Sequence, residues 1–277
     1  MNNKSINPTD TTESFSGLFS LDRFTNGFRK RDLIVVASRP GVGKTCFALN
    51  IASYAAKLSG RDIVYFSLEM SGQQLVSRLL SKESKIIENR LKVGKLHKNE
   101  WDRFKRAAIS ISDSSLVIID DATMSITDMY NKCKLFNNLG LVIIDYVQLI
   151  SSGSNDPTGK YENRVQNFTE ISRMMKVMAV ELNIPVICLS QLNRDIDYRT
   201  NQKPALNDLR EFGSLSQDAD VIFGLYRDDY YDVESGNPDT VEVIILKNRH
   251  GSGGTVPLGW LPERATFYEL PGQPAWG

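Results

Sequence analysis

The stretch DLIVVASRPGVGKT, residues 32–45, joins a continuous apolar run to a glycine-rich loop that ends in Lys-Thr. The apolar run over residues 32–38 is typical of a β-strand that is covered on both faces. Residues 45–59 then carry apolar side chains at helical spacing, and Gly60 follows them as a helix stop. A strand, a glycine-rich loop and a helix in this order form the context that a phosphate-binding loop (P-loop) requires.

The glycine-rich loop predicts a nucleotide site with bound Mg²⁺. Gly41 and Gly43 let the backbone turn so that its N–H groups point at phosphate oxygens. Lys44 is expected to reach the β and γ phosphates, and the Thr45 hydroxyl to ligand Mg²⁺. The strict pattern has glycine at the first position, where this chain has Ser38. The predicted nucleotide-binding residues are Ser38, Arg39, Pro40, Gly41, Val42, Gly43, Lys44, Thr45 and Cys46.

Strand and helix patterns alternate along the rest of the chain. Further strands are predicted over residues 62–68, 116–120, 141–145, 184–190, 221–226 and 241–246. Helices are predicted from the Ser71–Gln74 capping box onward and over residues 162–182. This alternation predicts an α/β fold, with a mostly parallel twisted sheet and helices on both faces. A glycine-rich turn over residues 251–254 predicts a C-terminal β-hairpin.

We expect residues 1–30 to form an N-terminal tail or linker, and residues 31–277 to form one ATPase domain. The first residues are polar and contain no apolar core of the signal-peptide kind. No apolar run approaches the roughly 20 residues that a membrane span needs. These features predict a cytoplasmic protein with no membrane partner.

Composition limits the class of partner. The 277 residues carry 33 Lys and Arg against 33 Asp and Glu, so the formal net charge is zero. This balance excludes a uniformly basic nucleic-acid coat protein, yet it allows a local basic groove. Cys46, Cys133 and Cys188 are scattered, and none lies near His97 or His250 in a zinc-binding spacing.

Hydrolysis of a bound nucleotide requires further polar groups at the ends of neighbouring strands. Asp120 and Asp145 each end an LVIID run, so the spacing leaves either as the second magnesium ligand, although Asp121 favours a turn at the first copy. Glu69 follows the second strand and is a candidate to activate water, or else a solvated loop acid. Gln191 follows the fifth strand, where its amide could sense the γ phosphate or line the DNA path, or it is simply a polar residue that ends a strand.

An ordered series of motifs resembles the motor domain of the replicative DnaB-family helicases over about residues 27–270. The motifs are RPGVGKT (39–45), SLEM (67–70), LVIIDYVQLI (141–150), EISRMMKVMAVELNIPVICLSQLNR (170–194), DLREFGSLSQDAD (208–220) and IILKNRHG (244–251). The resemblance implies a RecA-like P-loop NTPase core. It also implies a hexameric ring that hydrolyses Mg-ATP, moves 5′ to 3′ on single-stranded DNA and unwinds duplex during DNA replication.

The resemblance also implies roles for single residues of the site. It maps the magnesium-associated aspartate to Asp145 and not to Asp120, because the family's residue is followed by Tyr and Gln. It maps the catalytic glutamate to Glu69 and the γ-phosphate sensor to Gln191, which join Lys44 as catalytic residues.

Two cations near the C-terminus are implied to act on the nucleotide of a neighbouring subunit. The family carries such cations on a hairpin, and they map to Lys247 and Arg249. Residues two apart on a strand point to the same face, which suits a joint role. An arginine of this kind is worth a factor of about 10³–10⁵ in rate. Without the resemblance, the pair would be interpreted as a solvated strand edge.

A DNA-binding loop is implied by the segment DLREFG. The resemblance places Arg210, Glu211 and Gly213 against the DNA backbone. From the residues alone, Arg210 could equally form an ion pair with Asp208 or Glu211. Phe212 stands where the family commonly has a small residue, so it either alters the loop or offers a surface on which a base stacks.

Family members usually carry an N-terminal helical domain, whereas here only residues 1–30 precede the strand of the P-loop. We expect either a fragment or a naturally short form, assembling as a homohexamer or remaining monomeric as an isolated domain. A helicase loader and a primase are the expected protein partners. Two alternative functions remain: a RecA- or clock-type relative that forms a ring or filament on DNA without unwinding, and a catalytically weak domain that docks a loader.

Overall fold

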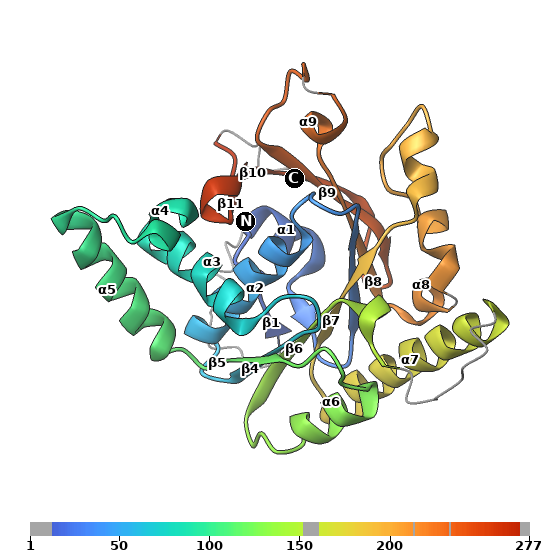
Figure 1. Cartoon of the computed structure of the whole chain (residues 1–277). Helices are drawn as coiled ribbons and strands as arrows, with labels where there is room; N and C mark the ends of the chain where they lie inside the picture. Colours follow the sequence, from blue (N-terminus) through green and yellow to red (C-terminus); the bar gives the residue numbers. More distant parts are fainter. Residues whose placement is uncertain (1–12, 152–160, 213, 233, 272–277) are drawn as a thin grey trace, which may run out of the picture.

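A nine-stranded sheet forms the centre of the protein in the computed structural model, which describes residues 13–151, 161–212, 214–232 and 234–271 (Figure 1). Its strand order is β11-β10-β9-β8-β3-β7-β6-β4-β5. The strands are β3 (Leu33–Ser38), β4 (Asp62–Ser67), β5 (Leu116–Asp120), β6 (Leu139–Asp145), β7 (Val186–Gln191), β8 (Val221–Tyr226), β9 (Thr240–Asn248), β10 (Gly254–Leu261) and β11 (Thr266–Glu269).

The pairing confirms a mostly parallel sheet with a C-terminal hairpin. The strands β8, β3, β7, β6, β4 and β5 pair in parallel with one another, in this order. Strand β9 pairs antiparallel with β8, β10 with β9, and β11 with β10. The predicted turn over residues 251–254 connects β9 to β10, which is the predicted hairpin.

Helices cover both faces of this sheet, and alternate residues of each central strand enter different cores (Figure 1). Ile34 and Val36 of β3 face the helices α2 (Lys44–Leu58) and α3 (Gly72–Ser84). Leu33 and Val35 face α6 (Ile126–Cys133) and α7 (Tyr161–Leu182) instead. Because both faces are buried, the central strands are apolar along most of their length, as expected for a parallel sheet, and become polar at their carboxyl ends.

Shorter elements connect these layers and extend from them. They are β1 (Glu13–Ser14), α1 (Phe19–Thr25), β2 (Phe28–Arg29), α4 (Glu88–Val93), α5 (Lys98–Ser112), η1 (Val147–Leu149), η2 (Arg194–Tyr198), η3 (Leu206–Phe212), α8 (Leu215–Asp218), α9 (Asp228–Tyr231) and η4 (Pro262–Arg264). Across the part of the chain that the structure describes, none of the helices combines the length and the apolar character that crossing a bilayer demands.

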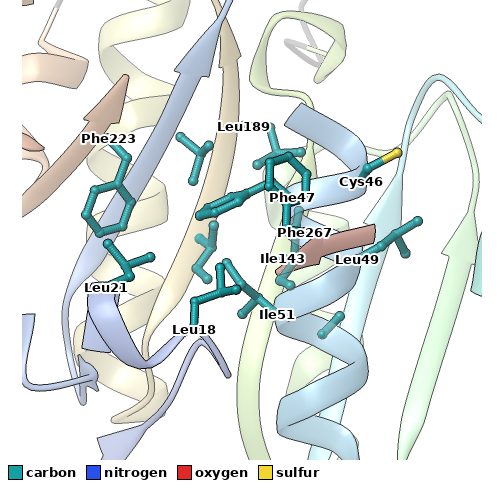
Figure 2. Close-up of a cluster of buried hydrophobic side chains, with 14 of the residues drawn as sticks. Leu18, Leu21, Cys46, Phe47, Leu49, Ile51, Ile143, Leu189, Phe223 and Phe267 are labelled. Carbon is teal, nitrogen blue, oxygen red and sulfur yellow. The ribbon is translucent and has the colours of Figure 1, made fainter. Parts of the chain in front are cut away.

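The expected N-terminal tail over residues 1–30 is wrong for its second half. Residues 13–30 form β1, α1 and β2, and the side chains of Leu18, Leu21 and Phe28 are buried in the core on the α2 side of the sheet. Figure 2 shows Leu18 and Leu21 beside Phe223 and Ile51, which belong to β8 and α2. A seven-residue helix carries too few apolar positions for a clear period in the sequence, so only packing reveals it.

Replacing Leu21 by alanine tests whether this segment is part of the core. Leu21 is fully buried, and removing a buried leucine side chain typically costs about 2–5 kcal/mol. We therefore expect Leu21→Ala to lower the free energy of unfolding by that amount in urea titrations. Phe19→Ala in the same helix is the matched control, since Phe19 is 64% exposed and its loss is expected to change stability by less than about 0.5 kcal/mol. Equal effects of the two substitutions would contradict the packing of α1.

Candidate active site

The carboxyl ends of the parallel strands meet at one edge of the sheet. Ser38 of β3 lies in register with Gln191 of β7, and Ser67 of β4 lies in register with Asp145 of β6. Glu69 follows two residues after the end of β4. Ligands of open α/β sheets bind in the crevice beyond the carboxyl ends of the strands. The predicted site residues on four separate segments therefore converge on this edge.

The P-loop connects β3 to α2 in a conformation that requires glycine. Gly41 and Gly43 have φ angles of 79° and 115°, in the region that side chains disfavour. A Cβ atom on Gly43 would also lie 3.3 Å from Cζ of Phe267 and 3.5 Å from Cζ2 of Trp260. No side chain caps α2 at Gly43, so the first N–H groups of the helix remain open to an anion.

A pocket of about 330 Å³ opens over the P-loop. The predicted residues that line it are Arg39, Pro40, Gly41, Gly43, Lys44, Thr45, Cys46, Glu69 and Gln191. Sequence reasoning missed its other lining residues, which are Met70, Arg78, Glu88, Tyr146, Trp260, Pro262 and Ala265. The structure thus brings the P-loop together with the predicted glutamate and glutamine in one cavity.

Asp145 lies buried behind the P-loop. The Tyr65 hydroxyl donates to its Oδ2 at 2.8 Å, whereas its Oδ1 is buried without a hydrogen-bond partner among the described residues. Burial raises the pKa of the Asp145 carboxyl, and the Tyr65 hydroxyl, the Lys44 ammonium and the Thr45 hydroxyl oppose that rise. A buried carboxylate oxygen without a donor, next to a threonine hydroxyl, fits a hard cation such as Mg²⁺.

Asp120, the other candidate for the magnesium-associated acid, has a structural role. Its Oδ2 accepts a hydrogen bond from the backbone N–H of Gly72 at 2.6 Å, at the first turn of α3. The side chain of Asp120 is therefore occupied at the start of a helix. Of the two aspartates, the P-loop cluster contains Asp145, as the family resemblance implies.

Lys44 sits between an aromatic ring and two acids. Its Nζ lies 4.7 Å from the centroid of the Tyr146 ring, within the range of a cation–π contact. Burial lowers the pKa of Lys44, and the charges of Asp145 and Glu69 oppose that shift. A partly desolvated ammonium at the base of the pocket is poised to bind phosphate oxygens.

Gln191 is held in place by a second glutamine that sequence reasoning did not single out. Gln148 donates through Nε2 to the backbone oxygen of Gln191 at 3.0 Å and to Oγ of Ser190 at 3.1 Å. Its Oε1 accepts the backbone N–H of Gln191 at 3.3 Å. The position of Gln148 within LVIIDYVQLI, three residues after Asp145, was the available signal.

Several P-loop side chains stabilise the loop itself. The Arg39 guanidinium donates to both carboxylate oxygens of Asp197, at 3.0 and 2.7 Å, and to the backbone oxygen of Leu192 at 2.9 Å. The Ser38 hydroxyl donates to the backbone oxygen of Arg39, and Val42 is buried in the core. These side chains are already engaged, so Ser38, Arg39 and Val42 offer chiefly their backbone groups to a phosphate.

Lys247 and Arg249 lie at the opposite edge of the sheet. The backbone N–H of Arg249 donates to the oxygen of Asp220, and the N–H of Asp220 donates to the oxygen of Leu33, both at 2.9 Å. Leu33 is the first residue of β3, and Ser38, where the P-loop begins, is about 17 Å further along at roughly 3.3 Å per residue. An arginine side chain cannot span that length, so Arg249 does not reach the pocket of its own chain, and the Lys247 ammonium is held by the backbone oxygens of Ser216 and Gln217.

The predicted DNA-binding residues are only partly covered by the structure. The backbone of Arg210 and Glu211 belongs to η3, while their side chains and the whole of Gly213 lie outside the described residues. Asp208, the alternative partner of Arg210, accepts from Arg199 at 2.9 Å and from the N–H of Ala205 at 2.8 Å.

Comparisons with known proteins show the family of the chain. A model of the DnaB-like helicase C terminal domain family matches residues 15–269. The replicative DNA helicase DnaB of Geobacillus stearothermophilus is 44% identical over 258 residues, which are 92% of this chain and 56% of that protein. The chain thus spans about half the length of the curated relatives it matches.

Two solved structures share the fold over nearly the whole chain. The ATPase domain of G40P has a TM-score of 0.88 and 36% identity, covering 95% of this chain and 93% of that chain. A DnaB-like replicative helicase, solved with attention to its interactions with primase, has a TM-score of 0.88 and 37% identity, covering 94% of this chain and 62% of that chain. The RecA-like ATPase core is therefore confirmed, and the chain belongs to the DnaB-like helicase C-terminal domain family.

Proposed function

We propose that this chain is the ATP-dependent motor of a replicative DNA helicase. In this proposal a homohexameric ring hydrolyses Mg-ATP at its subunit interfaces, translocates 5′ to 3′ on single-stranded DNA and unwinds duplex during DNA replication. The observation that carries the proposal is the pocket at the carboxyl edge of the sheet, where Lys44, Thr45, Glu69 and Gln191 converge. Membership of the family supports it.

Each residue of the pocket has a distinct task in hydrolysis. The Lys44 ammonium binds the β and γ phosphates, and the open N–H groups at the start of α2 bind further phosphate oxygens. Thr45 and Asp145 would hold Mg²⁺, which when bound offsets phosphate charge. Glu69, whose carboxylate is exposed in the pocket, accepts the proton of the attacking water.

Gln191 completes this set. Its backbone is clamped by Gln148, so its side chain projects from a fixed point at the end of β7. An amide at this place can orient the γ phosphate by donating a hydrogen bond.

Lys247 and Arg249 supply positive charge to the nucleotide of the adjacent subunit in this proposal. Their distance from the pocket of their own chain supports a role in trans. Charge that develops on the transferred phosphoryl group is stabilised by donors that are already oriented.

The partners proposed for the ring are single-stranded DNA, further copies of the chain, a primase and a helicase loader. Arg210, Glu211 and Gly213 are the proposed DNA contacts. A primase as partner is supported by the similarity to the DnaB-like replicative helicase whose structure was described together with its interactions with primase. We place the activity in the cytoplasm of a bacterial or phage-infected cell.

Family membership favours a helicase over the alternative of a RecA- or clock-type relative that forms a ring or filament without unwinding. A forked DNA duplex separates these functions. We expect strand displacement that depends on ATP and on a free 5′ tail, measured by the release of a fluorescent strand. DNA-stimulated ATPase activity without displacement would instead support the non-unwinding relative.

Substitution of the two pocket residues should have different effects. Lys44→Ala is expected to abolish ATP binding, whereas Glu69→Gln should retain binding and lose about 10²–10⁴-fold in hydrolysis rate. Binding of a fluorescent ATP analogue and phosphate release measure the two steps. Glu234→Gln, a change of an exposed glutamate after α9, is the control and should leave both unchanged. Hydrolysis by Glu69→Gln at the wild-type rate would exclude Glu69 as the base.

Arg249→Ala tests the role in trans. We expect ATP binding to be spared and hydrolysis to fall by about 10³–10⁵-fold, because transition-state charge loses its partner. Hydrolysis per wild-type subunit should also rise with protein concentration as interfaces form. Lys132→Ala, which removes an exposed cation on α6, is the control. If Arg249→Ala weakens ATP binding as much as it slows hydrolysis, the role in trans is wrong.

A further inference from the structure

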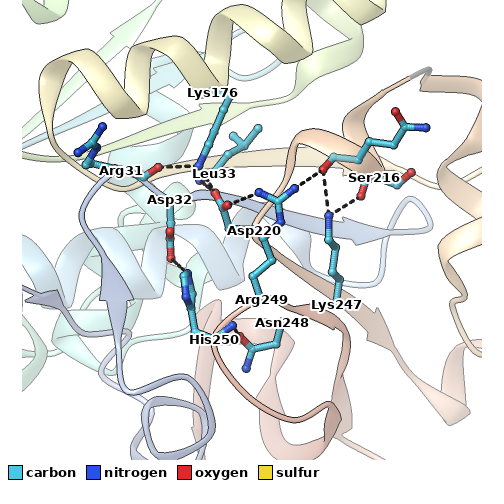
Figure 3. Close-up of polar contacts among 11 residues, drawn as sticks. Arg31, Asp32, Leu33, Lys176, Ser216, Asp220, Lys247, Asn248, Arg249 and His250 are labelled. Carbon is cyan, nitrogen blue, oxygen red and sulfur yellow. Dashed lines mark hydrogen bonds and ion pairs between the residues drawn. The ribbon is translucent and has the colours of Figure 1, made fainter.

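Arg249 is anchored to its own subunit at two points although its side chain is half exposed. Its NH1 group donates to Oδ1 of Asp220 at 2.9 Å, and its NH2 group donates to the backbone oxygen of Gln217 at 2.8 Å (Figure 3). The Arg249 side chain is 48% exposed, whereas that of Asp220 is 5% exposed. Because a guanidinium is a rigid plane with five N–H donors, two anchors set its orientation and leave other N–H groups free to face outward.

Asp220 is itself held rigidly at the base of β3. Its Oδ2 accepts the backbone N–H of Leu33 at 2.8 Å and the ammonium of Lys176 at 2.5 Å. A buried carboxylate that contacts two cations and a backbone N–H has partners for both of its oxygens, and these contacts fix its position. Asp220, which anchors Arg249, is thus fixed to β3, the strand that leads into the P-loop.

The residues on either side of Arg249 are tied down as well. Lys247 donates from Nζ to the backbone oxygens of Ser216 and Gln217 at 2.9 and 3.0 Å. Nε2 of His250 lies 2.8 Å from Oδ2 of Asp32 (Figure 3). Lys247 and Arg249 therefore both contact α8, the helix that directly follows the proposed DNA-binding loop.

We propose that Asp220 is a positioning residue for hydrolysis in trans: it orients Arg249 so that the unanchored N–H groups face the nucleotide of the neighbouring subunit. The proposal rests on the role in trans proposed above for Arg249. A flexible surface arginine would have to be ordered during each reaction, whereas an anchored one is already in place. Asp220 contributes this order without touching the nucleotide.

Asp220→Asn is the first test, since it keeps the size of the side chain and removes the charge that Arg249 binds. We expect kcat for DNA-stimulated ATP hydrolysis to fall about 10–100-fold, with little change in KM for ATP. Glu83→Gln is the matched control, because Glu83 of α3 also contacts two cations, Lys57 and Lys82, neither of which belongs to the Asp220 cluster. It should leave kcat unchanged. An unchanged kcat for Asp220→Asn would overturn the proposal.

Mixing of subunits distinguishes positioning from a general structural role. Asp220→Asn subunits retain an intact pocket, and Glu69→Gln subunits retain a positioned Arg249, so mixed rings contain working interfaces. We expect the mixture to recover as much activity as a reference mixture of Arg249→Ala with Glu69→Gln. Recovery in the reference mixture alone would overturn the positioning role of Asp220. Recovery in neither mixture would overturn the role of Arg249 in trans, and with it the proposed interface mechanism.

A second variant is needed if Asp220→Asn does not fold, which the loss of a cooperative unfolding transition would reveal. Asp220→Glu keeps the charge that Lys176 needs and displaces the carboxylate by one methylene group. We expect a lower kcat that is recovered on mixing with Glu69→Gln subunits. A wild-type kcat, or a loss that mixing does not recover, would count against the proposal.

Discussion

The parallel pairing of β3 with β7 and β8 is the constraint on which both proposed functional edges of the molecule depend. Ile34 to Ala37 lie in register with β7 and β8, and both faces of the strand are buried. This pairing places Ser38 beside Gln191 at the carboxyl edge and holds Leu33 against Asp220 at the amino edge. One buried strand therefore positions the P-loop at one end and the Arg249 anchor at the other. In the proposed ring, a nucleotide between two subunits would contact the carboxyl edge of one subunit's sheet and the amino edge of its neighbour's sheet.

The charges of the chain are sorted by position, although they sum to zero. Asp220 collects Lys176 and Arg249 at one edge, while Lys44 faces Asp145 and Glu69 at the other. Each cluster compensates its own buried charge, as buried ionic groups require. Neutrality of the whole chain is therefore compatible with two strongly charged functional edges, and it says little about binding.

Two sets of hydrogen bonds hold the end of β7 and the segment after it, one from the P-loop and one from η1. Arg39 grips Asp197 in η2 and the backbone of Leu192, and Gln148 grips the backbone of Gln191. The Arg39 contacts link the P-loop to the segment after β7, and the Gln148 contact links η1, which follows β6, to the end of β7. Movement of one segment must therefore strain charge-assisted or paired hydrogen bonds to the other.

The sequence by itself determined the order of the strands from β3 to β10 and of the helices α2, α3 and α7, the P-loop with Lys44 and Thr45, and the class of the fold, because these features are local and periodic. Resemblance to a family, rather than spacing, selected Asp145 over Asp120 and nominated Lys247 and Arg249. Only the tertiary structure decided the partners of Asp220, the cap that Asp120 makes on α3, and the burial of Leu18 and Leu21. Those facts depend on contacts between residues far apart in the chain, which no local pattern encodes.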